Sequence, residues 1–476
     1  MAELEWRYLF PFEKVPHGSR ILIYGAGTLG RAYLQQMEQT KYAEVVAVID
    51  RAADKCPHLV VPILPPEKIP NLCFTYVVVA LRGKVGYKEI ERKLLVFGVE
   101  KANIVFVGER EPVAIESDAR YNKGDIKQGK AFQCSNIAIA FRLTGGLGDF
   151  LIQKRLMLEI FRLLPNAKVD IYTRGSIDFI SLIYRDCSSV NGIYADFDEK
   201  YAKLKLEYAL AMSVVGSGYV KVDFFVKNSF NEQPDFVERI KRLKLLTESE
   251  NVGFNVPSAL MFWQRIYKGQ NAYTGFCYDG IFPICDKRVF VMEEPEDISN
   301  FNKLKLGKYI TMNFGNGESQ TSFNIAKTWP RERFELLVAL IKQKYDIQII
   351  QIGAKNADII KGTDKQFFGA RFGLVAQILK YSILHIDIEG GMTHLASQLG
   401  TKCAVLFGPT PMAYYAYDNN INIQAGNCHN CYGLYQEVNK CARGMKEPEC
   451  MYSITPEIVM SSIKSYMYMK IKEFKR

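Results

Sequence analysis

Short apolar runs, many of them rich in β-branched residues, recur along the chain and are separated by segments long enough for a helix. The first of them, RILIYGAGTLGRAYL, starts as a strand, passes through a glycine turn and continues as a helical pattern. EVVAVID, YVVVAL and NIVFVG continue this rhythm. Uninterrupted apolar runs of this kind are typical of parallel strands buried on both faces. We therefore predict an α/β domain over residues 1–112, followed by a polar linker without periodicity over 113–134.

The same rhythm begins again twice. NIAIAFRL leads into TGGLGD, a long helical pattern and the strand KVDIYT. Farther on, KYITMNF, DIQIIQIG, ILHIDI and KCAVLFG alternate with helical segments. These runs predict two further α/β domains, over 135–300 and 301–476. Tandem α/β domains bind ligands in the cleft at the carboxyl ends of their strands.

Composition agrees with a multidomain globular protein. The 476 residues are 48% hydrophobic and 24% charged, and at about 150 residues per domain they fill roughly three. No apolar run approaches the ~18 residues of a membrane span, and the N-terminal residues do not resemble a signal peptide, so we expect a cytoplasmic protein. The net charge of +10 is spread along the chain, and no nucleic-acid partner is implied.

The C-terminal tail, residues 461–476, has a local excess of basic residues. This leaves open a peripheral contact with the inner face of the membrane, while a solvated helix end is the plainer interpretation. The basic residues of the tail are Lys464, Lys470, Lys472, Lys475 and Arg476.

Three glycines in GAGTLG follow the first strand at the spacing of the dinucleotide-binding fingerprint. Gly25, Gly27 and Gly30 would let the backbone approach a pyrophosphate at the start of a helix. Asp50 ends the next strand, where an acid can bond a ribose hydroxyl. The pattern predicts NAD(P) binding, and it also fits a strand-to-helix turn in a domain that has lost its cofactor.

A second glycine loop, Gly145, Gly146, Leu147, Gly148 and Asp149, opens the second α/β domain. It resembles the GGxGD segment of the heptosyltransferases, glycosyltransferase family 9. The resemblance implies that Asp149 is the general base that deprotonates the acceptor hydroxyl, with Gly145, Gly146 and Gly148 lining the substrate. The other interpretation of Asp149 is a cap of the following helix.

The segment IAKTWPRERF places Lys327 before a Trp-Pro pair, as in that family. The resemblance implies that Lys327 neutralises the departing diphosphate, whereas a surface lysine is the alternative. We expect Trp329 to pack in the core, Pro330 to open a helix, and Arg333 to be solvated.

The segment IEGGMTHLASQLGTKCAVLFGPT is the strongest match to the family. Its glycines and the following residues would present backbone amides to a phosphate at a helix start. Glu389 and Gly390 replace the Asp and hydroxyl residue of the family pattern. His394 would bond a phosphate or serve the local structure, and Asp358 would reach the ribose. The implied donor-binding residues are Lys327, Asp358, Glu389, Gly390, Gly391, Met392, Thr393 and His394.

Four cysteines, Cys428, Cys431, Cys441 and Cys450, lie in one short stretch. A C-x2-C pair followed by two more thiols suits one tetrahedral zinc or iron ion. Similar cysteines in the autotransporter heptosyltransferases hold a structural iron. Free or partly paired thiols are the alternative, and His429 is a candidate substitute ligand.

The resemblance covers about residues 136–465. It implies a GT-B glycosyltransferase of two facing Rossmann-like domains. It does not cover the first domain, whose own pattern predicts a separate Rossmann-like, NAD(P)-binding-type domain that precedes them. The implied reaction is an inverting, metal-independent sugar transfer from a nucleotide sugar, ADP-heptose above others. The acceptor is a lipopolysaccharide core, another surface glycan, a lipid-linked glycan or a protein. An NAD(P)-dependent nucleotide-sugar-modifying enzyme, a non-catalytic assembly module and a homo-oligomer also remain open.

Overall fold

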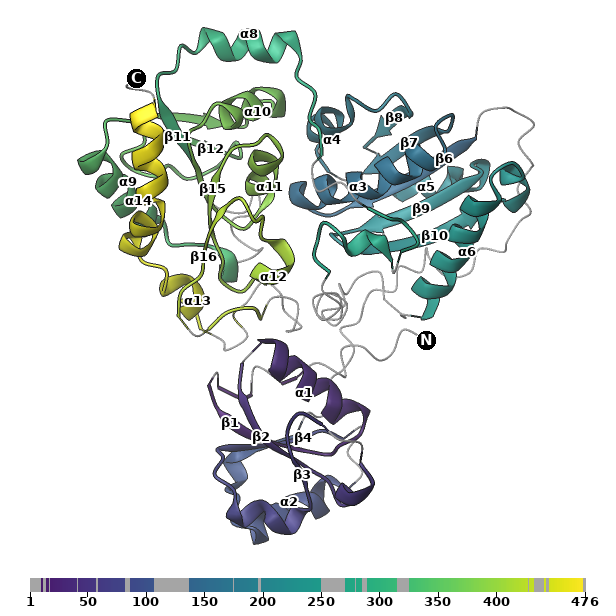
Figure 1. The fold of residues 1–476 in the computed structure, drawn as a ribbon, viewed down its shortest axis with the longest axis vertical. Coiled ribbons are helices and arrows are strands. Elements are labelled where there is room, and N and C mark those ends of the chain that lie inside the picture. Colours follow the sequence, from purple (N-terminus) through teal and green to yellow (C-terminus); the bar gives the residue numbers. More distant parts are fainter. Residues whose placement is uncertain are drawn as a thin grey trace.

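A computed structural model describes residues 10–473 except 12–13, 17, 41, 57–58, 82–85, 107–136, 174, 196–197, 250–269, 279, 285–288, 315–324, 427, 432–440 and 442–444. The predicted linker 113–134 and the tail residues Lys475 and Arg476 lie outside the described residues. The described residues form three separate sheets in three α/β units (Figure 1).

The first unit is a parallel sheet in the order β3-β2-β1-β4-β5. Its central strand is apolar on both sides: Ile21 and Ile23 pack into one core, and Leu22 and Tyr24 into the other. This double burial explains why the sequence pattern shows unbroken apolar runs. The elements are β1 (Arg20–Tyr24), α1 (Thr28–Thr40), β2 (Glu44–Ile49), η2 (Ala53–Lys55), β3 (Ile63–Leu64), η3 (Pro66–Asn71), β4 (Tyr76–Val79), α2 (Tyr87–Val96), η4 (Lys101–Asn103) and β5 (Ile104–Phe106).

The second unit has the order β10-β9-β6-β7-β8, with β10 antiparallel to β9. The turn between β9 and β10 contains Gly216, whose φ of +54° favours glycine. The elements are β6 (Ala138–Thr144), α3 (Leu147–Leu163), β7 (Lys168–Thr173), α4 (Ile177–Tyr184), β8 (Val190–Tyr194), α5 (Asp198–Leu204), η6 (Lys205–Glu207), β9 (Leu210–Val215), β10 (Tyr219–Phe225), η7 (Lys227–Phe230), α6 (Pro234–Ser249) and η8 (Gly275–Cys277).

The third unit is a parallel sheet in the order β13-β12-β11-β14-β15-β16. The C-terminal helix α14 packs on α9 and covers one face, and α8 packs on α10. The elements are α8 (Pro295–Lys303), β11 (Tyr309–Asn313), η9 (Ile325–Lys327), α9 (Arg331–Lys344), β12 (Gln348–Gly353), β13 (Lys365–Phe368), α10 (Phe372–Lys380), β14 (His385–Ile388), α11 (Gly391–Gln398), β15 (Cys403–Leu406), α12 (Met412–Tyr415), β16 (Ile421–Ile423), α13 (Glu449–Tyr452) and α14 (Pro456–Glu473).

The three sheets share one topology. Counted within each unit, the strand order of the first five strands is 3-2-1-4-5, as in the Rossmann fold. In this topology the strand order reverses between strands 1 and 4. Ligands bind at the carboxyl ends of the strands beside that point. The loops after β1, β6 and β14, which carry the three glycine motifs, all begin there.

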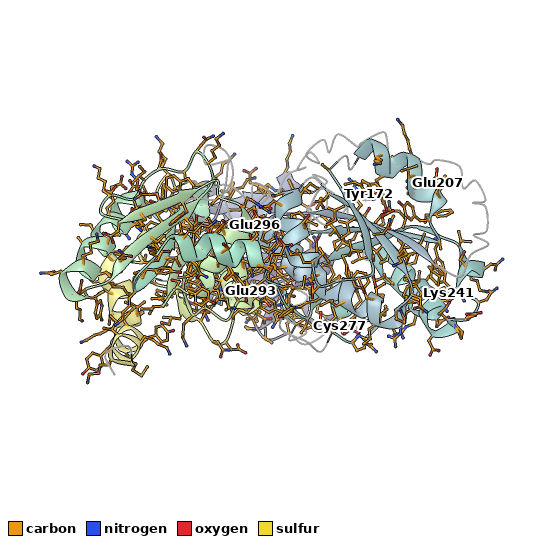
Figure 2. The ribbon with its side chains drawn as sticks, turned by 90° about the horizontal axis from the view of Figure 1, so that it is seen from above. Tyr172, Glu207, Lys241, Cys277, Glu293 and Glu296 are labelled. Atoms are coloured by element: carbon orange, nitrogen blue, oxygen red, sulfur yellow. The ribbon has the colours of Figure 1, made fainter. Side chains whose placement is uncertain are left out.

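The second and third units face each other, and the first unit lies beyond them (Figure 1). One apolar core runs through both facing units, from Ile139 to Tyr415. Charged pairs reinforce the contact: Arg185 of the second unit bonds Asp297 of α8 at 2.8 Å, and the Phe372 amide donates to Asp178 at 2.7 Å. Figure 2 looks onto this pair of units and labels Glu293, whose carboxylate binds Gln377 and Lys380 of α10.

The boundaries of the units stay a prediction, because no contact in the structure defines them to the residue. In the described part of the chain, no helix is long and apolar enough to cross a membrane.

Candidate active site

The second glycine loop holds Asp149 in the first turn of α3. Strand β6 ends at Thr144, and Gly145 adopts a φ of +140°. A Cβ atom on Gly145 would lie 2.6 Å from the Cβ of Asp149, so this turn requires glycine. The Gly146 amide donates to Asp149 Oδ2 at 2.7 Å. The capping bond of Asp149 is therefore present, and its role as a base stays a prediction.

The environment of Asp149 favours proton uptake. Burial raises the pKa of this carboxyl above its usual value, while the Gly146 amide, His394 and Lys327 act in the opposite direction. A carboxylate with a raised pKa is a stronger base than an exposed one. A general base works best when its pKa lies near the working pH.

On the third unit, a buried ion pair joins Lys327 and Glu389. Lys327 Nζ lies 2.7 Å from Glu389 Oε2, and His394 Nε2 lies 3.1 Å from Glu389 Oε1. Burial acts to raise the pKa of Glu389, but Lys327 and His394 outweigh it and lower the pKa to about 2. Glu389 is therefore a carboxylate at neutral pH. The predicted diphosphate-binding lysine is held by a residue 62 positions away in the sequence.

The glycine loops of the two units touch each other. A Cβ atom on Gly148 would lie 2.4 Å from His394 Cδ2, and one on Gly391 would lie 2.7 Å from the Cβ of Leu147. The starts of α3 and α11 therefore meet closely, with Asp149 on one side and the Lys327–Glu389 pair on the other. Helix starts carry partial positive charge and unpaired amides, so this place suits an anion.

His394 is enclosed by residues that the sequence patterns did not single out. Its Nδ1 lies 3.1 Å from the Tyr417 hydroxyl, which also accepts from Gln398 Nε2 at 2.9 Å. The ring of Tyr417 packs on that of Tyr273, with centroids 4.4 Å apart. The only hint in the sequence is the aromatic run YYAY after the FGPT segment.

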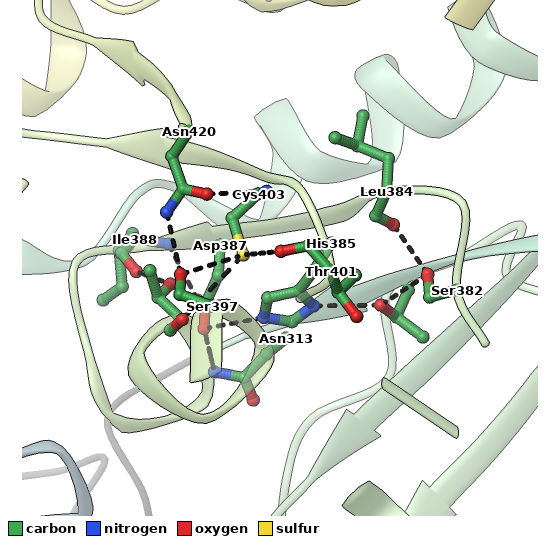
Figure 3. Close-up of polar contacts among 12 residues, drawn as sticks. Asn313, Ser382, Leu384, His385, Asp387, Ile388, Ser397, Thr401, Cys403 and Asn420 are labelled. Carbon is green, nitrogen blue, oxygen red and sulfur yellow. Dashed lines mark hydrogen bonds and ion pairs between the residues drawn. The ribbon is translucent and has the colours of Figure 1, made fainter. Parts of the chain in front are cut away.

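A second buried polar network joins side chains of β11 and β14 (Figure 3). His385 Nδ1 bonds the Thr311 hydroxyl at 3.0 Å, and His385 Nε2 lies 3.4 Å from Asp387 Oδ2. Asn313 donates to Asp387 at 3.1 Å. Burial raises the pKa of Asp387, although His385, Asn313 and the Ile388 amide act to lower it. The network joins the ends of β11 and β14, from which the two donor-side loops depart.

Several predicted donor-binding residues have structural contacts. The Thr393 hydroxyl donates to the Ile388 carbonyl at 2.9 Å, and Met392 packs against the shared core. Gly390 is the cap residue of α11, with extended backbone. Asp358 is exposed and lies 3.9 Å from Arg331, and no described contact joins it to Glu389 or Lys327.

Trp329 is fully buried, as predicted, and its indole donates to the Ile454 carbonyl at 2.8 Å. The prediction of a solvated Arg333 is wrong. Its guanidinium donates to the carbonyls of Tyr452 and Ile454, because the end of α13 and the residues before α14 pack where the sequence pattern indicated solvent.

In the first unit, the glycine loop has the geometry of the fingerprint. Gly25 has a φ of +116°, and a Cβ atom on Gly30 would lie 1.8 Å from the Gly25 carbonyl oxygen. A Cβ atom on Gly27 would meet no atom within 4 Å. Asp50, however, accepts from the amides of Ala26 at 2.7 Å and Ala52 at 2.9 Å. In this structure Asp50 therefore stabilises the glycine loop through these two hydrogen bonds.

The four clustered cysteines are neighbours. The Cys428 thiol hydrogen-bonds to Cys450, and this contact, burial and the nearby Cys431 and Cys441 raise the pKa of Cys450. His429 Nδ1 is buried without a hydrogen-bond partner among the described residues. In that part of the chain, no three His, Cys, Asp or Glu side chains surround a common centre as metal ligands do. In this arrangement Cys428 and Cys450 share a hydrogen bond, and all four side chains are thiols.

Together, the second and third units form the GT-B arrangement of two facing Rossmann-like domains. Residues 17–105 match a family model described as C2185-like, N-terminal. No curated protein sequence matches the chain.

Solved structures similar to the chain include three bacterial glycosyltransferases. The ADP-heptose lipopolysaccharide heptosyltransferase II of Escherichia coli is 13% identical, with a TM-score of 0.44 over 70% of this chain and 99% of that one. A glycosyltransferase family 9 protein of Veillonella parvula is 12% identical, with a TM-score of 0.45 over 71% and 100%. The iron-containing dodecameric glycosyltransferase TibC of enterotoxigenic E. coli is 14% identical, with a TM-score of 0.42 over 70% and 76%.

Proposed function

We propose that the chain is an inverting glycosyltransferase of the heptosyltransferase family that uses a nucleotide-activated sugar, with ADP-heptose as the first donor to test. The observation that carries the proposal is the placement of Asp149, a carboxyl with a raised pKa, close to the buried Lys327–Glu389 pair at the meeting point of two helix starts.

In the proposed reaction, Asp149 takes the proton of an acceptor hydroxyl. The hydroxyl oxygen forms a bond to the anomeric carbon of the donor as the bond from that carbon to the diphosphate breaks. The electron pair leaves with the diphosphate, whose charge is stabilised by Lys327 and by the amides of Gly391, Met392 and Thr393. In such a direct displacement the hydroxyl attacks the face of the sugar opposite the departing diphosphate, which inverts the configuration of the anomeric carbon.

The experiment is a transfer assay with purified protein and ADP-, UDP- and GDP-sugars, including ADP-heptose. Lipopolysaccharide core, a surface glycan and a serine-rich protein serve as acceptors. We expect nucleoside diphosphate release that depends on an acceptor, and NMR of the product should show an inverted anomeric carbon. A retained configuration, or no transfer with any of these donors, would contradict the proposal.

We also propose that Cys428, Cys431, Cys441 and Cys450 hold a structural zinc or iron ion. The support is chemical: four thiols and the buried Nδ1 of His429 are ligands that zinc and iron prefer. In the described part of the chain they do not yet surround a common centre, so binding would have to draw them together. A bound ion would replace the contacts between thiols by bonds from thiolates to the metal. The ion would stabilise the fold and take no part in the transfer reaction.

The NAD(P)-dependent alternative is supported by one observation, the space in front of Gly27. Binding of NAD or NADP by calorimetry tests it, with Gly27→Val as the variant that fills this space. Contact of α14 with an inner membrane surface and homo-oligomer formation stay predictions; Tyr468 and Met469 of that helix are 56% and 55% exposed.

A further inference from the structure

A directional chain of hydrogen bonds runs through the proposed active site. It begins at Gln398, passes through Tyr417 and His394, and reaches Glu389, which pairs with Lys327. Each of the four links is between 2.7 and 3.1 Å long. Tyr417 is the link that lies outside the matched motifs.

The direction of each bond follows from the chemistry of the groups. Glu389, with a pKa near 2, is a carboxylate and can only accept, so His394 Nε2 carries a proton. In a neutral imidazole the other nitrogen is then an acceptor. In that neutral form the Tyr417 hydroxyl donates to His394 Nδ1, while its oxygen accepts from the Gln398 amide.

The orientation of Gln398 is set by the contact between the units. Its Oε1 accepts from the Val289 amide at 2.6 Å and from Arg155 at 3.4 Å. Arg155 belongs to α3 of the second unit, and its guanidinium also lies 4.9 Å from the centre of the Tyr273 ring. With Oε1 facing Arg155 and Val289, the Nε2 of Gln398 must face Tyr417.

We propose that Tyr417 is a positioning residue whose hydroxyl selects the Nε2–H tautomer of His394 and thereby fixes Glu389 and Lys327 in place. Since Gln398 orients Tyr417 and is held by Arg155, this placement of Lys327 depends on contact between α3 and α11. The inference rests on the proposed function, which gives Lys327 its role toward the diphosphate.

A double-mutant cycle on binding of inorganic pyrophosphate, followed by calorimetry, tests this role. Pyrophosphate represents the two phosphates shared by nucleoside diphosphate donors. Tyr417→Phe should weaken binding about threefold to tenfold, the effect of one hydrogen bond. In the Glu389→Gln background the chain is already interrupted, so Tyr417→Phe should change binding less than about twofold. Equal effects in both backgrounds would overturn the role of Tyr417.

Nitrogen-15 labelling of the histidines provides a readout without ligand. The chain has five histidines, and the His394→Gln variant identifies the signal of His394. We expect a protonated Nε2 and a bare Nδ1 in the wild type, and a mixture of tautomers in Tyr417→Phe. A proton on Nδ1 in the wild type would overturn the inference.

Tyr414→Phe is the matched control. It also removes a buried hydroxyl from the same stretch, one that bonds the Ser217 carbonyl at 3.2 Å, away from His394. It should leave pyrophosphate binding and the His394 signal unchanged. Wild-type protein that binds no pyrophosphate would overturn the proposed function, and the role of Lys327 with it. Additive effects in protein that binds pyrophosphate would overturn only the role of Tyr417.

Discussion

At the residue scale, different charged partners give the two buried carboxyls Asp149 and Glu389 opposite properties. Both carboxyls lie at the same meeting point, but Glu389 has Lys327 at 2.7 Å and His394 at 3.1 Å. These partners lower its pKa to about 2, whereas the pKa of Asp149 is raised. One carboxyl is thus suited to accept a proton and the other to remain charged, a division common in acid–base sites.

Asp149→Asn should reduce transfer by about a hundredfold to ten-thousandfold, the contribution of general base catalysis, with donor binding unchanged. The amide can still accept from Gly146 but cannot take a proton. In the wild type, the rate should fall with decreasing pH as Asp149 protonates, at a pH above the usual range of aspartate. Steady-state rates and calorimetry of donor binding measure both effects. Near-normal turnover of the variant would place the base elsewhere.

The same substitution makes a prediction for stability. Folding raises the pKa of Asp149. When the pH exceeds the pKa of an ordinary aspartate, ionisation therefore favours the unfolded chain, and the folded protein becomes less stable. Asp149→Asn removes this cost, so its Tm at neutral pH should equal or exceed that of the wild type. A large loss of Tm would show that the carboxylate is primarily a helix cap.

Glu389→Gln should destabilise the protein by about 3–5 kcal/mol, because the largely buried Lys327 ammonium would lose the carboxylate that neutralises it. The pKa of Glu389 is lowered on folding, so its contribution is complete above about pH 4.5 and declines as the pH falls toward 2. Denaturant unfolding of the wild type and the variant at pH 7 and pH 3 measures how the difference in their free energies of unfolding depends on pH. Glu335→Gln, at the exposed Arg331 pair, is the control and should change stability by less than about 0.5 kcal/mol.

At the element scale, the contact between the starts of α3 and α11 depends on backbone without side chains. The closest approaches are Gly148 to His394 and Gly391 to Leu147. A methyl group at either glycine would push the two helix starts apart. The neighbouring Gly390 could carry a methyl group without touching α3.

Gly391→Ala should therefore lower transfer and stability, since its Cβ would lie 2.7 Å from Leu147 and 3.3 Å from the Gly148 amide. Gly390→Ala is the matched control. Its nearest neighbour would be 4.0 Å away, and its φ of −177° is open to any residue. Thermal melts and transfer assays of the pair measure the effect. If the two variants had the same Tm and the same transfer rate, close contact between the starts of α3 and α11 would not be required.

The cysteine segment gives a second prediction at this scale. Purified protein should contain about one zinc or iron ion per chain by elemental analysis, and Cys428→Ser should lower Tm more than turnover at low temperature. Cys73→Ser, at an exposed thiol of the first unit, is the control. Metal-free protein with unchanged Tm would contradict the proposed ion.

At the scale of the whole molecule, the second and third units share one apolar core, while the first unit has two cores of its own. Cys431 of the cysteine segment packs against one of these cores. The first unit therefore has its own hydrophobic cores around its own sheet. Through Cys431 it is also in contact with the third unit.

Removal of residues 1–134 should leave a soluble protein that unfolds cooperatively, because its cores do not include the first unit. Residues 1–112 expressed alone should also fold. Circular dichroism and thermal melts of both fragments are the measurements. An insoluble 135–476 fragment would show that the first unit is required for assembly.

The three α/β units and many of their strands could be predicted from local sequence pattern. For KVDIYT the prediction and strand β7 coincide, because a run of apolar and β-branched residues specifies a buried parallel strand locally. The glycine loops were also predictable, since steric constraints on Gly25 and Gly145 act within the turn itself. Asp149, Glu389 and His394 were located through their motifs.

The contacts of these residues, in contrast, depend on how distant parts of the chain pack together. Lys327 and Glu389 are 62 residues apart, and Arg155 and Gln398 are 243 apart, and neither pair belongs to a common periodic pattern. Their pairing follows from desolvation: a charge or hydroxyl buried where two units meet must find a polar partner, whichever part of the chain supplies it. The sequence analysis missed the contacts of Tyr417 and of the half-buried Arg333 for this reason, because their partners come from the packing of distant elements.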